Sequence, residues 1–236
     1  VIDKVTVRRT RHNIENDKDY KNDLKAQGIA FPQPQPPISL EYKMDRGTSY
    51  RFFYTLNVLS DDKFDPHLHY ARYRAVEFLK PEYQAKYRNA VHVGQTLAGI
   101  YRVHMVKRLE SSFHAFKLSL QTLLRITDDM LKMFDEDKVV IAPELNVKDL
   151  QAKGLELDEI IEKALSRGYT KEDIVYKADD FAPGFIEMLR HDKEVLEGLN
   201  ADWQEECNDP KFERFRKTLE QEFFDERNIS GKLVVF

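Results

Sequence analysis

The sequence predicts a mainly α-helical protein. Only 9 of the 236 residues are glycine, which argues against an all-β sandwich with its many tight turns. Apolar residues recur at helical spacing over most of the chain, and 42% of the residues are hydrophobic, enough to bury a substantial core. We therefore expect a protein built on one long spine helix, with a few short strands at the two ends and near residues 38–44.

The first 44 residues predict a thin helix, a linker and a strand. Residues 13–27 are polar and charged with sparse apolar positions, typical of a solvated helix that Gly28 would end. Four prolines within residues 31–37 force an extended, polyproline-like crossing. Residues 38–44 then alternate apolar and polar at period two, the pattern of a half-buried strand.

The middle of the chain carries the strongest helical pattern. From Ser49 the apolar residues move to helical spacing, and a second helix is predicted over residues 67–79, with Pro66 at its first turn. Between residues 93 and 134, six apolar residues are spaced 3, 4, 3, 4 and 3 apart, which places all six on one stripe of a single long helix, the predicted spine. The six are Val106, Leu109, Phe113, Phe116, Leu120 and Leu123.

The C-terminal half predicts shorter helices and differs in charge. Residues 1–127 hold 21 basic and 13 acidic residues, a net charge of +8, whereas residues 128–236 hold 16 and 28, a net charge of −12. The total charge of −4 therefore gives no overall basic signature of a nucleic-acid binder, although the chain is lopsided in charge. A break or early turn is expected at Pro183 and Gly184. Helices are predicted over residues 147–167, 179–200 and 210–226.

No autonomous catalytic centre is visible in the sequence. A phosphate-binding loop, G-x-x-x-x-G-K-[ST], is missing, as are the H-E-x-x-H zinc motif and the G-x-S-x-G nucleophile elbow. His67 and His69 are two residues apart, so on a helix their side chains would point about 200° apart and would not converge on one ion. A single cysteine, Cys207, leaves no basis for a disulfide framework or a cysteine-rich zinc site. No metal site is predicted.

The expected location is the cytoplasm. No apolar run approaches the roughly 20 residues needed to span a bilayer, and no signal-peptide pattern opens the chain. Together with the lone cysteine, these observations predict a soluble, cytoplasmic protein with no membrane partner.

Arginines near the N-terminus and in the middle of the chain are candidate phosphate ligands. Arg8, Arg9 and Arg11 follow the first predicted strand, where consecutive arginines can offer forked donors to phosphate or carboxylate oxygens. Arg72 and Arg74 lie on either side of Tyr73, close to Tyr70, and add basic and aromatic groups to the helix predicted before the spine. Arginines paired with surface acids are the alternative interpretation.

The spine helix carries the second group of candidate phosphate ligands. Lys107 and Ser111 are four residues apart, as are Arg108 and Ser112, so that each pair brings a cation and a hydroxyl to one face of the helix. Lys117 continues the basic series farther along. Cations with hydroxyls suit a phosphodiester backbone, and a solvated charged face is again the alternative.

Both ends of the sequence look cut. Residue 1 is valine rather than methionine, and residues 5–7 already alternate in the manner of a strand. Residues 232–236 contain an apolar run that suits a strand buried on both faces of a parallel sheet, which requires neighbours on both sides. The alternative is a terminal strand packed on its own domain. We expect an excised piece of a longer protein.

Four stretches of the chain resemble the Swi/Snf-type helicase-like ATPases of superfamily two, and within them the bacterial branch related to RapA. Residues 7–11 look like the Arg-Arg-Thr-Lys/Arg block at the exit of the first RecA-like lobe, and the proline run from Phe31 looks like the stretch that follows it. Residues 71–79 and 107–116 look like two helical blocks of that branch. Residues 230–236 look like the strand that opens the second lobe, and the order of the stretches agrees over the whole chain.

The resemblance implies a domain organisation. Residues 1–11 would be the exit strand of the first lobe and residues 229–236 the first strand of the second. Residues 12–228 would form the helical inter-lobe or protrusion region, basic over residues 46–127 and acidic over residues 128–228.

The resemblance also implies a function. In the family, the Walker motifs and the arginine finger lie in the two lobes, outside this chain. The parent would be an ATP-driven helicase or translocase that uses ATP and Mg, whereas this segment would hydrolyse no ATP and hold no cofactor. Its partners would be double-stranded DNA and the flanking lobes.

Two other functions stay open from the residues alone. A stand-alone helical adaptor that binds a protein partner would explain the acidic half and the absence of catalytic motifs. A nucleic-acid-binding adaptor would explain the basic half.

Overall fold

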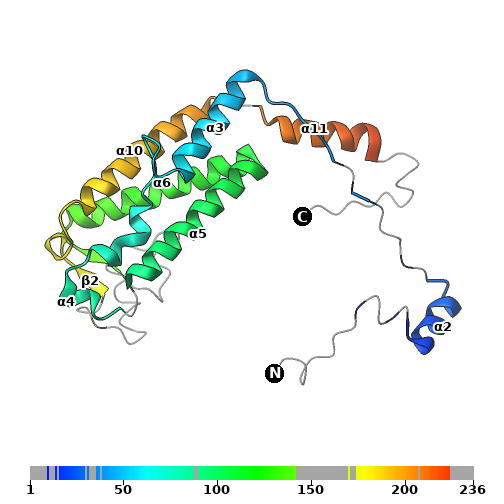
Figure 1. Ribbon diagram of the computed structural model, residues 1–236, viewed down its shortest axis with the longest axis horizontal. Coiled ribbons are helices and arrows are strands. Elements are labelled where there is room, and N and C mark those ends of the chain that lie inside the picture. Colours follow the sequence, from blue (N-terminus) through cyan, green and yellow to red (C-terminus); the bar gives the residue numbers. More distant parts are fainter. Residues whose placement is uncertain are drawn as a thin grey trace. The chain divides into compact units, whose positions relative to one another are not determined.

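The protein is mainly helical, as the sequence predicts (Figure 1). The computed structural model describes residues 10, 14, 16–29, 31, 36, 37, 39–87, 90–141, 170, 174–206 and 208–223. The chain divides into two compact units, residues 1–40 and 41–236, and the boundary closely follows the proline-rich stretch. The elements, with η for non-α helices, are α2 (Lys18–Ala26), α3 (Arg46–Ser60), η2 (Ala71–Phe78), α4 (Pro81–Gln84), α5 (Ala90–Ser111), α6 (Phe113–Asp135), β1 (Val139–Val140), β2 (Val175–Tyr176), η3 (Ala178–Asp180), α10 (Phe185–Gln204), α11 (Pro210–Thr218) and η4 (Leu219–Phe223).

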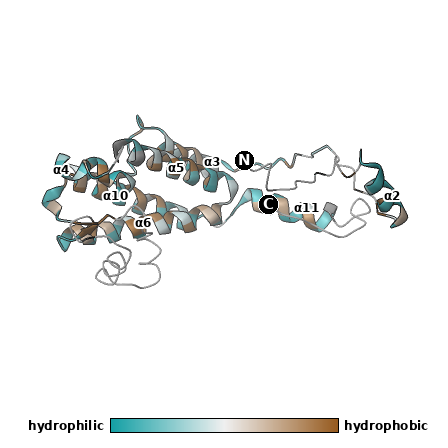
Figure 2. Ribbon diagram, turned by 90° about the horizontal axis from the view of Figure 1, so that it is seen from below, coloured by the Kyte–Doolittle hydropathy of each residue, from teal (hydrophilic) through white to brown (hydrophobic). Residues whose placement is uncertain are grey.

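The first unit contains the thin solvated helix that the sequence predicts. No residue of α2 is buried, and Figure 2 shows the helix as mostly hydrophilic. Asp17 caps its start, because the carboxylate accepts from the backbone N–H of Asp19 at 3.0 Å. Gly28 follows its end in the left-handed region, at φ 65°, which is the conformation expected of the predicted stop.

The predicted spine is two helices that pack against each other, so the expectation of one long helix was wrong. α5 ends at Ser111, α6 begins at Phe113, and Ser112 between them is extended, at φ −160° and ψ 132°. Free N–H groups at the start of α6 find acceptors: Ala115 donates to Ser112 Oγ at 3.4 Å, and Phe113 donates to the Asp209 carboxylate at 3.0 Å. The spacing of apolar residues predicts which face of a helix is buried, but it does not reveal a turn between two successive helices.

The first core of the second unit is built from α3, α5, α6 and α10. Five of the six predicted stripe residues are buried in it, and Val106 packs against it. Trp203 of α10 is fully buried, with its ring edge-on to Phe113 and Phe116 at centroid distances of 4.8 and 5.3 Å. Its Nε1 donates to the buried Oγ1 of Thr55 at 2.8 Å, which links α10 to α3.

Residues 67–79 do not form the predicted α-helix. The chain is irregular up to Tyr70, which takes a left-handed φ of 54°, and then forms the 3-10 helix η2. The cause lies on α10, where the Asp192 carboxylate accepts from the backbone N–H of His69 at 2.7 Å and of Ala71 at 2.8 Å. These two backbone N–H groups therefore donate to a side chain of α10, and not to carbonyl groups of their own segment as in an α-helix.

A second core follows η2 and is rich in phenylalanine. Leu79 forms an isolated antiparallel bridge with Phe181. The Phe181 ring stacks on Phe185 at a centroid distance of 5.4 Å and meets Phe134 edge-on at 4.8 Å. β1 and β2 lie antiparallel beside it, with Val139 opposite Tyr176.

The strand expected near residues 38–44 is not formed over residues 39–44, the part that the structure describes. Leu40 and Tyr42 are 37% and 39% exposed, and of the described apolar residues in this pattern Met44 packs against the first core, so the alternation does not form one buried face. Residue 38 and the strands predicted at both termini lie outside the described residues.

The C-terminal helices agree with the sequence in part. The helix predicted over residues 179–200 begins later, as α10 at Phe185, after Gly184 in the left-handed region at φ 92°. The helix predicted over residues 210–226 is α11 followed by the single π-type turn η4. The helix predicted over residues 147–167 lies outside the described residues.

Replacing Thr55 with valine should destabilise the second unit. The Thr55→Val variant keeps the side-chain shape and removes the acceptor of the Trp203 N–H, which then stays buried without a partner. We expect the free energy of unfolding to fall by about 1–3 kcal/mol in urea denaturation. Thr96→Val, at an exposed position of α5, is the matched control and should change it by less than about 0.5 kcal/mol. Equal effects of the two variants would contradict the role assigned to this hydrogen bond.

Candidate functional site

The structure separates the ten predicted phosphate ligands into three groups. Arg8, Arg9 and Arg11 lie outside the described residues. Four of the others have partners within the fold, and three are exposed on α5. The seven described residues are Arg72, Arg74, Lys107, Arg108, Ser111, Ser112 and Lys117.

Arg72 and Arg74 are engaged within the fold. The guanidinium of Arg72 is turned into the protein, where Nη1 donates to the carbonyl oxygen of Ile126, and burial lowers its pKa. Arg74 makes a forked pair with Glu77, with Nε 3.1 Å from Oε1 and Nη2 2.9 Å from Oε2. Gly94 of α5 packs against this pair, since a Cβ there would lie 2.8 Å from Glu77 Oε1. These two arginines hold η2 in place.

Ser112 and Lys117 also have internal partners. Ser112 caps α6, as described above, and is only partly exposed. Lys117 Nζ donates to the backbone carbonyl of Glu206, at the end of α10. The hydroxyl and the ammonium are thus used to join helices.

Lys107, Arg108 and Ser111 form an exposed group that we call the α5 cation surface. With 100° per residue, the three side chains lie within an arc of about 100° on the helix. None of them forms an ion pair with a carboxylate of the described residues, and Arg108 Nε donates to His104 Nε2 at 3.4 Å. Two cations and a hydroxyl therefore face solvent together.

The N-terminal half of α5 presents an apolar surface instead. Leu97, Ile100 and Val103 are 40%, 58% and 53% exposed. The spacing of three places them side by side on the helix, next to the turn that carries Lys107. One helix thus exposes an apolar segment followed by a basic one.

Three histidines and an aspartate form a cluster that the sequence interpretation missed. His67 and His69 do not point apart, because this segment is not helical, and their ring centroids are 4.5 Å apart. The ring of His191 on α10 lies 4.9 Å from that of His69. His67 Nδ1 is 2.9 Å from the carbonyl of Phe64, and His191 Nε2 is 3.1 Å from the carbonyl of His67, so both nitrogens donate.

Asp192 is the buried acid of this cluster. Burial raises its pKa to about 6, although the N–H groups of His69 and Ala71 stabilise its charged form and oppose that rise. Burial also lowers the pKa of His69, and the neighbouring His67 and His191 lower it further. The sequence contained a signal for Asp192, because it occupies one position of an otherwise apolar stripe spaced 4, 3, 4, 3 and 4. The stripe is Phe185, Leu189, Asp192, Leu196, Leu199 and Trp203.

Within the part of the chain that the structure describes, no group of three or more His, Cys, Asp or Glu side chains is placed to hold a metal ion. Two nitrogens of the histidine cluster are already committed to backbone carbonyls. These two hydrogen bonds anchor the backbone of the segment before η2. None of the described helices combines the length and apolar character required to cross a bilayer.

Comparisons with protein-family models, with curated proteins and with solved structures find no match to this chain.

The stability of the protein should depend on the protonation of Asp192. Because its folded pKa is raised above the unfolded value of 3.8, its contribution to stability is fully present below about pH 4 and is lost as the pH rises through 6. The advantage of the wild type over Asp192→Asn in free energy of unfolding should therefore shrink between pH 4 and 7, by at most about 3 kcal/mol. The lowered pKa of His69 has the opposite effect on stability, because it favours the unfolded chain below pH 6.5. Asp192→Asn retains His69, so this effect is present in both proteins.

Urea denaturation of the wild type and Asp192→Asn at half-unit steps of pH measures this difference. Asp179→Asn is the control, because Asp179 is an exposed carboxylate in η3. A difference between wild type and Asp192→Asn that stays constant over the whole range would contradict the raised pKa.

Proposed function

We propose that the chain is the inter-lobe segment of a bacterial Swi/Snf-type, RapA-like helicase or translocase of superfamily two. In this role it couples two RecA-like lobes and contacts the backbone of duplex DNA. ATP and Mg would be bound by the lobes, and the segment itself would hydrolyse no ATP. The proposal rests on the resemblance of the four sequence stretches, and one structural observation supports its DNA contact.

That observation is the α5 cation surface. Lys107, Arg108 and Ser111 are exposed, are close together on one helix and have no described carboxylate partner. Ammonium, guanidinium and hydroxyl groups are the usual protein partners of DNA phosphates, and such contacts position a protein on DNA without reading its sequence. A translocase needs contacts of this kind, because it moves over any sequence.

The packing around α5 supports the coupling role. Tyr73 of η2 stacks on Tyr101 of α5, with ring centroids 3.7 Å apart, and Arg72 reaches across to the backbone of α6. These contacts join η2 to both α5 and α6. A two-lobe motor steps when its lobes close around ATP, and a segment between the lobes transmits that rotation only if it moves as one body.

Duplex DNA binding by the chain should weaken as salt rises. A plot of log affinity against log salt between about 50 and 200 mM should be linear with a negative slope, because each phosphate contact releases counterions. The Lys107→Gln/Arg108→Gln double variant should reduce the magnitude of this slope by about 2. Fluorescence anisotropy with a labelled 20-base-pair duplex measures it.

Lys132→Gln/Lys193→Gln is the matched control for this titration. Both lysines pair with Asp128, at 2.8 and 2.6 Å, so their charges are already compensated and the slope should not change. An affinity that does not depend on salt, or an equal effect of the two double variants, would count against the α5 cation surface as the DNA contact.

A helical adaptor that binds a protein partner is the second candidate function. The exposed Leu97, Ile100 and Val103 favour it, since a row of large apolar side chains on one face of a helix is typical of a protein contact. The same DNA titration separates the two functions, because an adaptor of this kind requires no salt-dependent affinity for duplex DNA.

A further inference from the structure

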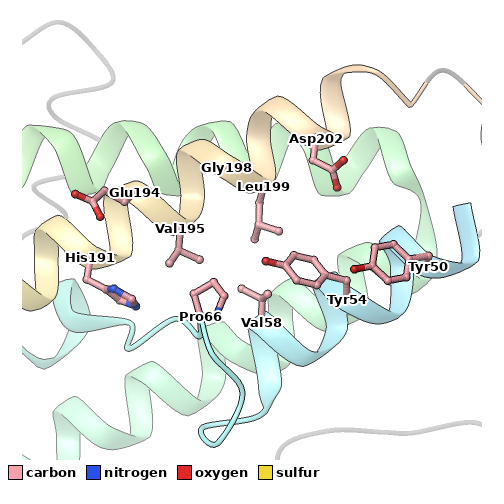
Figure 3. A pocket seen from close by; sticks show the side chains of 10 residues that line it. All are labelled: Tyr50, Tyr54, Val58, Pro66, His191, Glu194, Val195, Gly198, Leu199 and Asp202. Atoms are coloured by element: carbon pink, nitrogen blue, oxygen red, sulfur yellow. The ribbon is translucent and has the colours of Figure 1, made fainter. Parts of the chain in front are cut away.

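An open groove runs between α3 and α10 (Figure 3). Its volume of 610 Å³ is in the range of pockets that hold drug-sized ligands or short peptide segments. Tyrosines of α3 form one wall, acidic residues of α10 flank the other, and apolar side chains lie between them. The groove is lined by Tyr50, Tyr54, Val58, Pro66, His191, Glu194, Val195, Gly198, Leu199 and Asp202.

The two carboxylates mark the groove as a place for cations. Glu194 and Asp202 are separated by eight residues on α10, so they lie about 12 Å apart along the helix axis. Glu194 forms no ion pair with any described residue. Asp202 forms an ion pair with Arg51, whose Nε lies 3.0 Å from Oδ1, and the Asp202 side chain stays 42% exposed. Glu194 is therefore open to a positively charged guest, and Asp202, although paired with Arg51, keeps an exposed side that the same guest can reach.

The aromatic wall suits the same guest. The rings of Tyr50 and Tyr54 are nearly parallel, with an interplanar angle of 20° and centroids 6.2 Å apart, and Tyr50 is 73% exposed. The face of a tyrosine ring attracts ammonium and guanidinium groups. Figure 3 shows Tyr50 at the end of the groove where Asp202 lies, with Val58 and Pro66 toward the other end.

The fold leaves room in the middle of the groove. Gly198 lies between the two acids, and a Cβ added to it would have no atom of the rest of the fold within 4 Å, apart from its chain neighbours and the nearby backbone of α10. Glycine is the least favoured residue in a helix interior apart from proline, so its presence in α10 is not a requirement of the helix. Its missing side chain keeps the groove open.

We propose that this groove binds an extended basic peptide of another protein, with cationic residues at positions i and i+4 and an apolar residue at i+2. In an extended chain, residues i, i+2 and i+4 point to one side, and i and i+4 are about 13 Å apart, which matches the two acids. The residue at i+2 then meets Val58, Val195 and Leu199. The groove uses no residue of the α5 cation surface, so this inference does not depend on the proposed DNA contact.

The apolar centre distinguishes a peptide from a simple polycation. A polyamine could reach both carboxylates, yet it would bring no side chain to the apolar residues between them. Burial of a leucine or valine side chain there adds a contribution that depends on the position of that side chain in the peptide. An experiment should therefore vary the spacing of the cationic residues along the peptide.

The test uses the whole 236-residue chain and two fluorescein-labelled peptides of equal composition and charge, compared by anisotropy. Lys-Thr-Leu-Thr-Lys has the required spacing, and Lys-Lys-Leu-Thr-Thr does not. We expect the first to bind about tenfold more tightly. Glu194→Gln should weaken its binding about two- to fivefold, as expected for a partly exposed ion pair. Gly198→Leu should weaken it at least about tenfold, because its side chain would occupy the groove.

Gly99→Leu is the matched control for Gly198→Leu. Gly99 is also a helical glycine, exposed on α5, with no atom within 4 Å of an added Cβ, so both variants should fold and only the groove variant should lose binding. Equal affinity for the two peptides, equal loss in the two leucine variants, or full competition by spermidine at the concentration of the peptide would each overturn the proposal. A loss of duplex DNA binding would leave it unaffected, which separates it from the proposed function.

Discussion

The buried carboxylate of Asp192 joins the two cores of the second unit. It accepts from the N–H groups of His69 and Ala71, on either side of the point where the chain passes from the first core, which includes Leu68 and Tyr70, into the second, which includes Ala71 and Leu79. Burial raises the pKa of this carboxylate to about 6, and the two backbone donors, which stabilise its charged form, oppose that rise only in part. The segment before η2 is held on α10 by a group whose charge changes near neutral pH.

The hydrogen bonds of Asp192 fix the conformation of the neighbouring backbone and thereby the contacts of its side chains. Because residues 67–70 are held in an irregular conformation, the rings of His67 and His69 meet each other and His191 instead of pointing apart. Because η2 is then a 3-10 helix against α5, Arg72 points inward and Tyr73 stacks on Tyr101. Side chains that would be solvated on an isolated helix become part of the packing.

The helical unit therefore presents two surfaces of opposite character. The α5 cation surface carries two cations without a described carboxylate partner, whereas the groove between α3 and α10 is lined by Glu194, by Asp202 in its ion pair with Arg51, and by two tyrosine rings. The opposite net charges of the two halves of the sequence are reflected here, since α5 belongs to the half of +8 and α10 to the half of −12. The two proposals use different surfaces of this unit: the proposed DNA contact uses the α5 cation surface, and the proposed peptide binding uses the groove.

Residue type and the 3.6-residue period of a helix were enough to predict the helical class, the apolar stripes and the charge asymmetry. The stripe of α10 even marked Asp192 as a charged residue on a buried face. The turn at Ser112, the 3-10 helix over residues 71–78 and the exposure of particular basic residues could not be predicted, because they depend on how the helices pack. The turn and the 3-10 helix depend on acceptors far away in the chain, Asp209 for Phe113 and Asp192 for Ala71, and local periodicity carries no information about such partners.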